Sequence, residues 1–146
     1  MENVIAVDRT IHTASTVRGG RVMYRQAKVT VAGHPGLSIH EADTTGSLAA
    51  GEWPEGILFT LAVGESLAVA DYTGTLSVVK FGIVRCEAGE AMDPATVKAV
   101  SWDNQGRIRA ATGGVDYIIG ELVGAKEILA AGEECEVFVK IFAWET

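Results

Sequence analysis

The side chains best suited to chemistry are three histidines and two cysteines, and their spacing does not favour a site. His12, His34 and His40 lie far apart, and no two show the i, i+4 spacing that places a metal pair on one helix face. Cys86 and Cys135 form no CxxC motif and no Cys/His cluster, so the sequence predicts no zinc site. Each cysteine lies beside a glutamate, which disfavours the thiolate. We expect reduced structural thiols, as in the cytosol, although a single disulfide between them stays open.

The other candidates for catalysis or ligand binding give equally little. No serine lies in a nucleophile-elbow context, so a Ser-His-Asp arrangement is unsupported. The glycine-containing stretches 33–36 and 113–114 lack the spacing of phosphate-binding loops. The acidic run 133–136 is more typical of a solvated strand edge than of a cation site. We therefore predict no catalytic residue, no cofactor and no metal, and we expect that the chain is not an enzyme.

The charge of the chain is unevenly distributed. The net charge is −7, but residues 1–40 carry five basic side chains against two acidic ones, whereas the remaining residues carry seven against seventeen. A basic leading segment on an acidic body can reach an acidic neighbour, including a second copy of the chain, although an uneven solvated surface explains the pattern as well. The few basic residues and the acidic body argue against nucleic-acid binding.

Composition and length favour one packed globular domain. The chain has 146 residues, of which 48% are hydrophobic, enough for a genuine core. No apolar run approaches the ~20 residues of a membrane span, so we expect no membrane partner. The N-terminus lacks the basic region of a secretory signal, so we expect a protein that works in the cytoplasm or in an assembly made there.

The elements in the second half are short β-strands. The turn Asp103–Gly106 separates apolar strands at 97–102 and 107–111, which is typical of a hairpin. Residues 134–141 alternate, and the face to be buried holds Cys135, Val137, Val139 and Ile141. Gly82, inside a long apolar run, predicts a bend of the kind a small barrel needs at a corner.

Glycine turns and a polar leading segment complete the predicted fold. Ala-Gly-Glu recurs at 50–52, 88–90 and 131–133, with a near match at 63–65, and we expect turns whose glycine adopts a φ that other residues avoid. The predicted fold is mainly β, a small β-barrel or β-sandwich of short strands with an extended N-terminal arm. We assign residues 1–47 to the arm and polar loops and residues 48–146 to the β-rich body of a single domain.

The three tryptophans are candidates for core or interface positions. Trp53 and Trp102 are expected in the core by default. Trp144, with Phe142, lies close to the end of the chain, where a neighbouring subunit often buries a large aromatic side chain, and we assign these two residues to a subunit interface.

The order of these features resembles the small β-rich capsid decoration (cement) proteins of tailed bacteriophages. The resemblance covers roughly residues 84–142 and rests on turns, strands and small-residue pairs that follow one another in the order known from that family. These are Ala88-Gly89-Glu90, Pro94-Ala95, 97–102, 103–107, Ala110-Ala111-Thr112, Ile119-Gly120 and 130–137.

The resemblance implies a structural virion protein on the outer capsid surface of the bacteriophage head. Such a protein adds to the expanded shell, commonly as a homotrimer, and clamps adjacent major capsid protein subunits. The resemblance also implies an arm that lies along the shell and adds a strand to a capsid sheet edge. The arm residues that we expect to contact the capsid are Val4, Ile5, Val7, Arg9, Arg18, Arg21 and Arg25.

Two other functions remain open. The main alternative is a β-barrel or β-sandwich ligand-binding module, for example for carbohydrate, with Trp53, Tyr72 or Trp102 as a stacking platform. A trimeric β hydrolase ranks third and requires a titratable group in a deep pocket at a subunit boundary. A native mass separates the first two, since a trimer favours decoration and a monomer favours the binding module.

Overall fold

The computed structural model describes residues 2–6, 16–25, 29–31, 34–36, 39–68 and 75–140. Six residues named in the sequence analysis lie outside these ranges, so the predictions made for them stay predictions. They are Val7, Arg9, Tyr72, Ile141, Phe142 and Trp144. The described part is mainly β, as predicted, and its only helical element is a single 3-10 turn, η1 (Leu48–Ala50).

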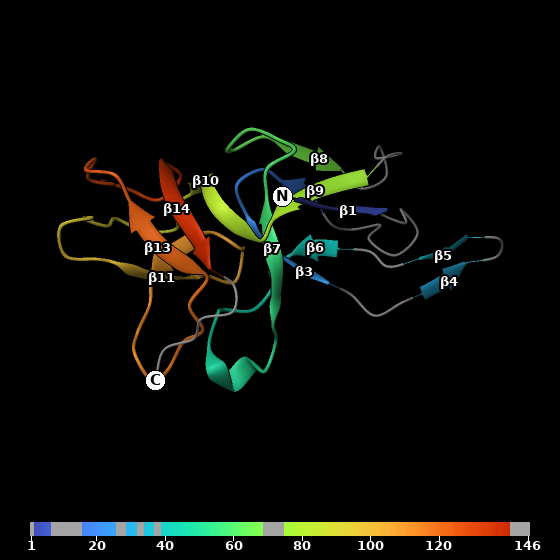
Figure 1. Cartoon of the computed structure of the whole chain (residues 1–146), viewed down its shortest axis with the longest axis horizontal. Helices are drawn as coiled ribbons and strands as arrows, with labels where there is room; N and C mark the ends of the chain where they lie inside the picture. Colours follow the sequence, from blue (N-terminus) through green and yellow to red (C-terminus); the bar gives the residue numbers. More distant parts are fainter. Residues whose placement is uncertain are drawn as a thin grey trace.

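Ten strands form two five-stranded antiparallel sheets (Figure 1). The first sheet has the order β1-β9-β7-β3-β6 and contains β1 (Glu2–Ala6), β9 (Thr75–Val79), β7 (Pro54–Leu58), β3 (Val22–Arg25) and β6 (Ile39–Glu41). The second sheet has the order β10-β14-β13-β11-β12 and contains β10 (Phe81–Glu87), β14 (Glu134–Lys140), β13 (Gly120–Val123), β11 (Ala99–Trp102) and β12 (Ile108–Ala110). Two small pairs complete the described strands, namely β2 (Thr16–Arg18) with β8 (Ser66–Ala68), and β4 (Val29–Val31) with β5 (His34–Gly36).

The second sheet follows the predicted pattern closely. In β14 the side chains of Cys135, Val137 and Val139 are buried, while the intervening residues are exposed or half-buried, which confirms the predicted alternation. The sheet also curls on itself, because Ala88, just after β10, forms an isolated bridge with Ile108 in β12. One end of this sheet therefore approaches the closed geometry of a small barrel.

The turn between β11 and β12 is the predicted hairpin. Asp103 accepts hydrogen bonds from the backbone N–H groups of Gln105 and Arg107, both at 2.9 Å, and so fixes the turn. Gly106 has a φ of 75°, and a Cβ there would lie 2.6 Å from the carbonyl oxygen of Val22. Glycine is required at this position both by the backbone conformation and by the close approach of β3.

The two sheets are joined by one continuous segment of chain. β9 belongs to the first sheet and β10 to the second, and the backbone bends at Lys80 between them (Figure 1). Gly82 follows with a φ of 122°, a conformation that L-residues avoid. The bend predicted from Gly82 thus lies two residues earlier, at the point where the strand leaves one sheet and enters the other.

The first sheet packs against core residues on both of its faces, and its sequence therefore lacks a clear strand pattern. Val22 and Tyr24 of β3 pack into a large cluster shared with the second sheet, whereas Met23 between them packs into a smaller cluster on the opposite face. In β7, Ile57 likewise packs into the large cluster and Leu58 into the smaller one. Residues 22–24 of β3 and 57–58 of β7 are buried on both faces, so apolar residues follow one another there without the alternation of a half-buried strand.

Part of the segment predicted as an arm lies in this core. Val17, Val22, Met23, Tyr24 and Ala42 are all buried. β3 lies inside the first sheet, between β7 and β6. Residues 17–24 and Ala42 therefore pack with the body of the domain.

The glycine turns agree with the prediction at three of four places. Gly51, Gly64 and Gly132 have φ values of 70°, 82° and 93°. Gly89 has no positive φ, so the expectation was wrong there. Gly89 is needed for space instead, because a Cβ would lie 2.5 Å from Oδ2 of Asp103.

Candidate functional site

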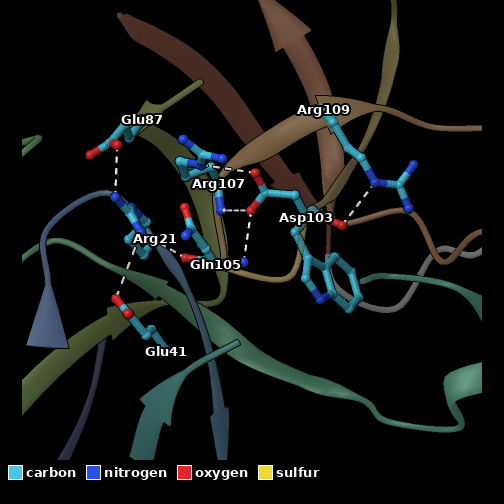
Figure 2. Close-up of polar contacts among 8 residues, drawn as sticks. Arg21, Glu41, Glu87, Asp103, Gln105, Arg107 and Arg109 are labelled. Atoms are coloured by element: carbon cyan, nitrogen blue, oxygen red, sulfur yellow. Dashed lines mark hydrogen bonds and ion pairs between the residues drawn. The ribbon is translucent and has the colours of Figure 1, made fainter. Parts of the chain in front are cut away.

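The most connected group of polar side chains lies between the two sheets and centres on Arg21 (Figure 2). Arg21 is 2% exposed, and its Nη2 donates a hydrogen bond to Oε1 of Glu87 at 2.7 Å. Its Nη1 donates to the backbone carbonyl of Gln105 at 2.8 Å and lies 3.8 Å from Oε2 of Glu41. One guanidinium thus links the start of β3 to the end of β10, to the β11–β12 turn and to β6.

Glu41 occupies the least favourable position of this network. Burial raises the pKa of its carboxyl above the usual range, and the nearby charges of Arg21 and Arg18 only partly oppose that effect. Within the described structure, Oε2 of Glu41 and the Nε atoms of Arg18 and Arg21 are buried without a hydrogen-bond partner. The group is therefore balanced in charge but not fully satisfied in hydrogen bonds.

Two further ion pairs stabilise the second sheet, one inside the β11–β12 turn and one between β12 and the loop that follows it. Nε of Arg107 donates to Oδ2 of Asp103 at 2.8 Å, inside the hairpin turn (Figure 2). Arg109 donates from Nη1 and Nη2 to the two oxygens of Asp116 at 2.8 and 2.9 Å, and its Nε donates to the backbone carbonyl of Trp102 at 2.9 Å. Burial opposes ionisation of Asp116, but the hydrogen bonds from Arg109 and from the N–H of Thr112 outweigh it and lower the pKa of the carboxyl.

These polar groups stabilise the fold and present little to solvent. Each charged side chain described above is turned toward another part of the same chain, and the central guanidinium is buried. Arg21 was expected on the arm, pairing with acidic groups of a partner. In the structure the acidic groups that it meets are Glu87 and Glu41 of its own chain.

The structure places the other expected arm residues separately. Val4 and Ile5 lie in β1, opposite Ser77 and Leu76 of β9. Arg18 is the last residue of β2, and Arg25 is the last residue of β3, opposite Ile39 of β6. These four residues therefore belong to three different strands of the described structure.

The aromatic residues form a chain from the surface into the core. Trp102 is fully buried, and its Nε1 donates to the hydroxyl of Tyr24 at 2.7 Å. Tyr117 stacks on Trp102 with ring centroids 6.3 Å apart, and Trp53 meets Tyr117 edge-on at 5.5 Å. Trp53 is 46% exposed. Of the three residues considered as a stacking platform, Trp102 is therefore excluded by burial, and Trp53 is accessible.

Sequence reasoning missed an apolar surface on β10, the edge strand of the second sheet. Phe81 is 61% exposed and Ile83 is 65% exposed, although both belong to a regular strand. Ile83 lines a groove of about 490 Å³, whose other wall is formed by residues 59–63 after β7. Phe81 lies outside the groove lining, two residues before Ile83 on the same strand. Arg85 and Glu134 are the charged residues in the groove lining, 3.8 Å apart. The available signal was two large apolar residues at 81 and 83, which share one face of the strand, opposite the buried Val84.

Nothing in the described residues points to a metal or a membrane helix. Among residues 2–6, 16–25, 29–31, 34–36, 39–68 and 75–140, no three His, Cys, Asp or Glu side chains are grouped to hold a metal ion. Over the same ranges, no helix has the length and apolar character needed to cross a bilayer. Comparison with protein-family models, with curated proteins and with solved structures finds no match.

Proposed function

We propose that this chain is a structural virion protein that binds the outer surface of a bacteriophage head and clamps adjacent major capsid subunits. The observation that carries the proposal is the exposed apolar strip on β10, with its adjoining groove. The resemblance of residues 84–142 to capsid decoration proteins supplies the identity of the partner. The proposal requires no catalytic residue, cofactor or metal.

The strip has the properties of a surface that is covered in an assembly. Edge strands of monomeric proteins are normally protected by charges, proline or short length. β10 has seven residues and one strongly exposed charge, Arg85, and it also exposes a phenylalanine and an isoleucine. Large apolar side chains grouped beside a groove are typical of interaction sites. Burial of the strip against a shell subunit or a sister copy removes this apolar surface from water.

Many copies bound to one shell can stabilise it even if each copy makes only modest contacts. Each copy needs only a small interface, since many copies on one lattice stabilise the shell together. We expect self-association into a homotrimer, because a ring of three copies matches a local three-fold position of the shell. The partners are thus the major capsid protein and the chain itself, and neither nucleic acid nor membrane is involved.

A pelleting assay with shells of the cognate major capsid protein, before and after expansion, tests the proposal. We expect saturable binding to expanded shells at a fixed ratio to capsid subunits. Phe81→Ser and Ile83→Ser should weaken this binding at least ten-fold. Leu129→Ser is the matched control, because Leu129 is 70% exposed and does not line the groove. Absence of binding to both shell forms would contradict the proposal.

A truncation tests the contribution of the arm. The structure limits how much can be removed, because Val17 is buried and the N–H of Gly20 donates to the carbonyl of Leu58 at 3.0 Å. A deletion of residues 2–20 would therefore damage the core, whereas a deletion of residues 2–6 removes only β1. We expect the shorter deletion to fold, as judged by circular dichroism, and to bind shells more weakly. Unchanged shell affinity would show that β1 is not part of the contact.

The second candidate function is a ligand-binding module, favoured by the exposure of Trp53. Its ring is held edge-on against Tyr117, which is a rigid arrangement suited to stacking against a sugar face. A glycan screen with the wild-type protein and Trp53→Ala separates the two functions. Binding that Trp53→Ala abolishes, together with a monomeric native mass, would favour the module over the decoration protein.

A further inference from the structure

Cys86 and Cys135 lie directly opposite each other on neighbouring strands. The register of β10 and β14 pairs Cys86 with Cys135, between the pairs Arg85–Glu136 and Glu87–Glu134. Both side chains point into the core, with exposed fractions of 0% and 3%. Both are free thiols in the structure. Two residues 49 positions apart in sequence are therefore nearest cross-strand neighbours on one face of the sheet.

The backbone hydrogen bonds define the geometry of this pair. The N–H of Ala88 donates to the carbonyl of Glu133, toward β14, whereas the N–H of Glu87 donates to the carbonyl of Gly20, on the opposite side. Because successive N–H groups of a strand point to opposite sides, the N–H of Cys86 points toward β14. Cys86 and Cys135 thus occupy a hydrogen-bonded pair, for which the Cα atoms are about 5.5 Å apart.

That separation permits a disulfide but does not favour a relaxed one. Disulfides span Cα–Cα distances of about 4.4–6.8 Å, so the pair lies within reach. The Cβ atoms of cross-strand pairs are about 4.5–5.5 Å apart, and the closer end of that range belongs to non-hydrogen-bonded pairs. A disulfide prefers a Cβ separation of about 3.8 Å, so closure draws the two strands together locally. Strained disulfides of this kind are reduced readily.

We propose that Cys86 and Cys135 form a reversible redox pair, which holds two thiols in reducing surroundings and closes to a cross-strand disulfide in oxidising ones. Closure covalently ties β10, the edge strand that carries the apolar strip, to β14. The pair acts within one chain. The inference therefore does not depend on which partner covers the strip.

The reaction needs a disulfide oxidant, and oxidised glutathione serves as one. The thiolate of one cysteine attacks a sulfur of oxidised glutathione and displaces one glutathione thiolate, leaving a mixed disulfide on the protein. The thiolate of the other cysteine attacks the protein-side sulfur, forms the Cys86–Cys135 bond and displaces the second glutathione thiolate. The two protein thiols are oxidised, one glutathione disulfide is reduced to two thiols, and the two protons pass to the glutathione thiolates.

The surroundings of the two cysteines slow the formation of the disulfide and favour bonding between the two protein thiols over a lasting bond to glutathione. Burial raises the pKa of both thiols, that of Cys135 to about 12, with the neighbouring glutamates adding to the effect at Cys135. The thiolate, which is the attacking form, is therefore scarce in the closed fold. Reaction proceeds when the edge strand opens locally, and the partner cysteine then competes with glutathione as the nearest nucleophile.

The test approaches the redox equilibrium from both sides with the full chain. One sample starts as reduced native protein, and the other is oxidised in urea and then refolded. Both are held in buffers of graded reduced-to-oxidised glutathione ratio, quenched and weighed by mass spectrometry. We expect both samples to converge on the same fraction of protein that has lost two hydrogen atoms and carries no glutathione. Peptide mapping should link Cys86 to Cys135, and dithiothreitol should restore both thiols.

A variant with a shifted thiol is the matched control. The double substitution Cys86→Ala with Val84→Cys keeps two buried thiols on the same face of the same strands, but position 84 is opposite Val137. This variant should not form the intrachain bond in the native state. Equal closure by the variant would overturn the proposal. Retained glutathione on the wild-type protein, or failure of the oxidised wild type to regain its native circular dichroism spectrum, would also overturn it.

Discussion

The two five-stranded sheets are built in different ways. The second sheet uses a single stretch of chain, residues 81–140, in which β11 pairs with β12 and β13 with β14, while β10 pairs with β14 at the far end of the stretch. The first sheet collects strands from residues 2–79, and its order places β1 next to β9 and β3 next to β7. Local turns thus specify the β11–β12 and β13–β14 pairs of the second sheet, whereas every pair of the first sheet joins strands that are not consecutive in the chain.

This difference indicates which part of the domain contributes most to its stability. The large core cluster takes residues from both sheets, whereas the small cluster serves only the outer face of the first sheet and its β2–β8 cover. The second sheet therefore cannot complete its core without β3 and β7. We expect changes at the junction between the sheets to cost more than changes within one of them.

The largest effect is expected at Trp102, which lies in the second sheet and contacts the first. Trp102→Ala removes a fully buried ring and its hydrogen bond to Tyr24, so the free energy of unfolding should fall by about 3–5 kcal/mol. Urea unfolding followed by circular dichroism measures the loss. Trp53→Ala is the control, because Trp53 is 46% exposed, and it should cost less than about 1 kcal/mol. Equal losses for the two variants would mean that the junction does not dominate stability.

The next largest loss of stability is expected from substitution of Arg21, whose side chain links the two sheets through polar contacts. Arg21→Met leaves the buried carboxylate of Glu87 without its partner, which should lower the free energy of unfolding by roughly 3 kcal/mol. The double variant Arg21→Met with Glu87→Gln removes the uncompensated charge and should recover part of that loss. Urea unfolding of both variants gives the coupling energy. If the double variant were as unstable as the sum of its single changes, the two residues would not act as a pair.

A smaller, pH-dependent loss of stability is expected from substitution of Asp116, in the second half of the chain. Asp116→Asn weakens the two hydrogen bonds from Arg109 and should cost roughly 2 kcal/mol at pH 7. The pKa of Asp116 is lowered on folding, so its contribution is present above the ordinary carboxyl pKa of about 4 and is lost as the pH falls through the lower, folded value. The difference in stability between wild type and variant should therefore shrink below about pH 4. A difference that stayed constant down to pH 2 would argue against this ion pair.

The parts of the fold that were predictable are those where local chemistry decides. The Asp103–Gly106 turn, the alternation in β14 and the glycine turns at Gly51, Gly64 and Gly132 follow from preferences of a few neighbouring residues. The first sheet was not predictable in this way, since β3 and β7 are buried on both faces and show no period of two.

The candidate site was less predictable than the fold. Arg21 looked like a solvated arm residue because its sequence neighbourhood is polar and basic, and only the approach of Glu87 and Gln105 gives it buried partners. The outward direction of Phe81 and Ile83 depends on which face of β10 meets the core, and sequence alone leaves that choice open. The facing of Cys86 and Cys135 depends on strand register in the same way.

The amino-acid sequence was enough to predict that the chain is mainly β, that strands alternate with glycine turns in its second half, and that Cys135 lies on the buried face of a strand. These features depend on backbone preferences and side-chain periodicity, which act over a few residues. The tertiary structure alone decided the order of the strands, the burial of Arg21, the exposure of the β10 strip and the cysteine pair. Each of these depends on the register and packing of segments that are distant in the sequence, and no local preference encodes them.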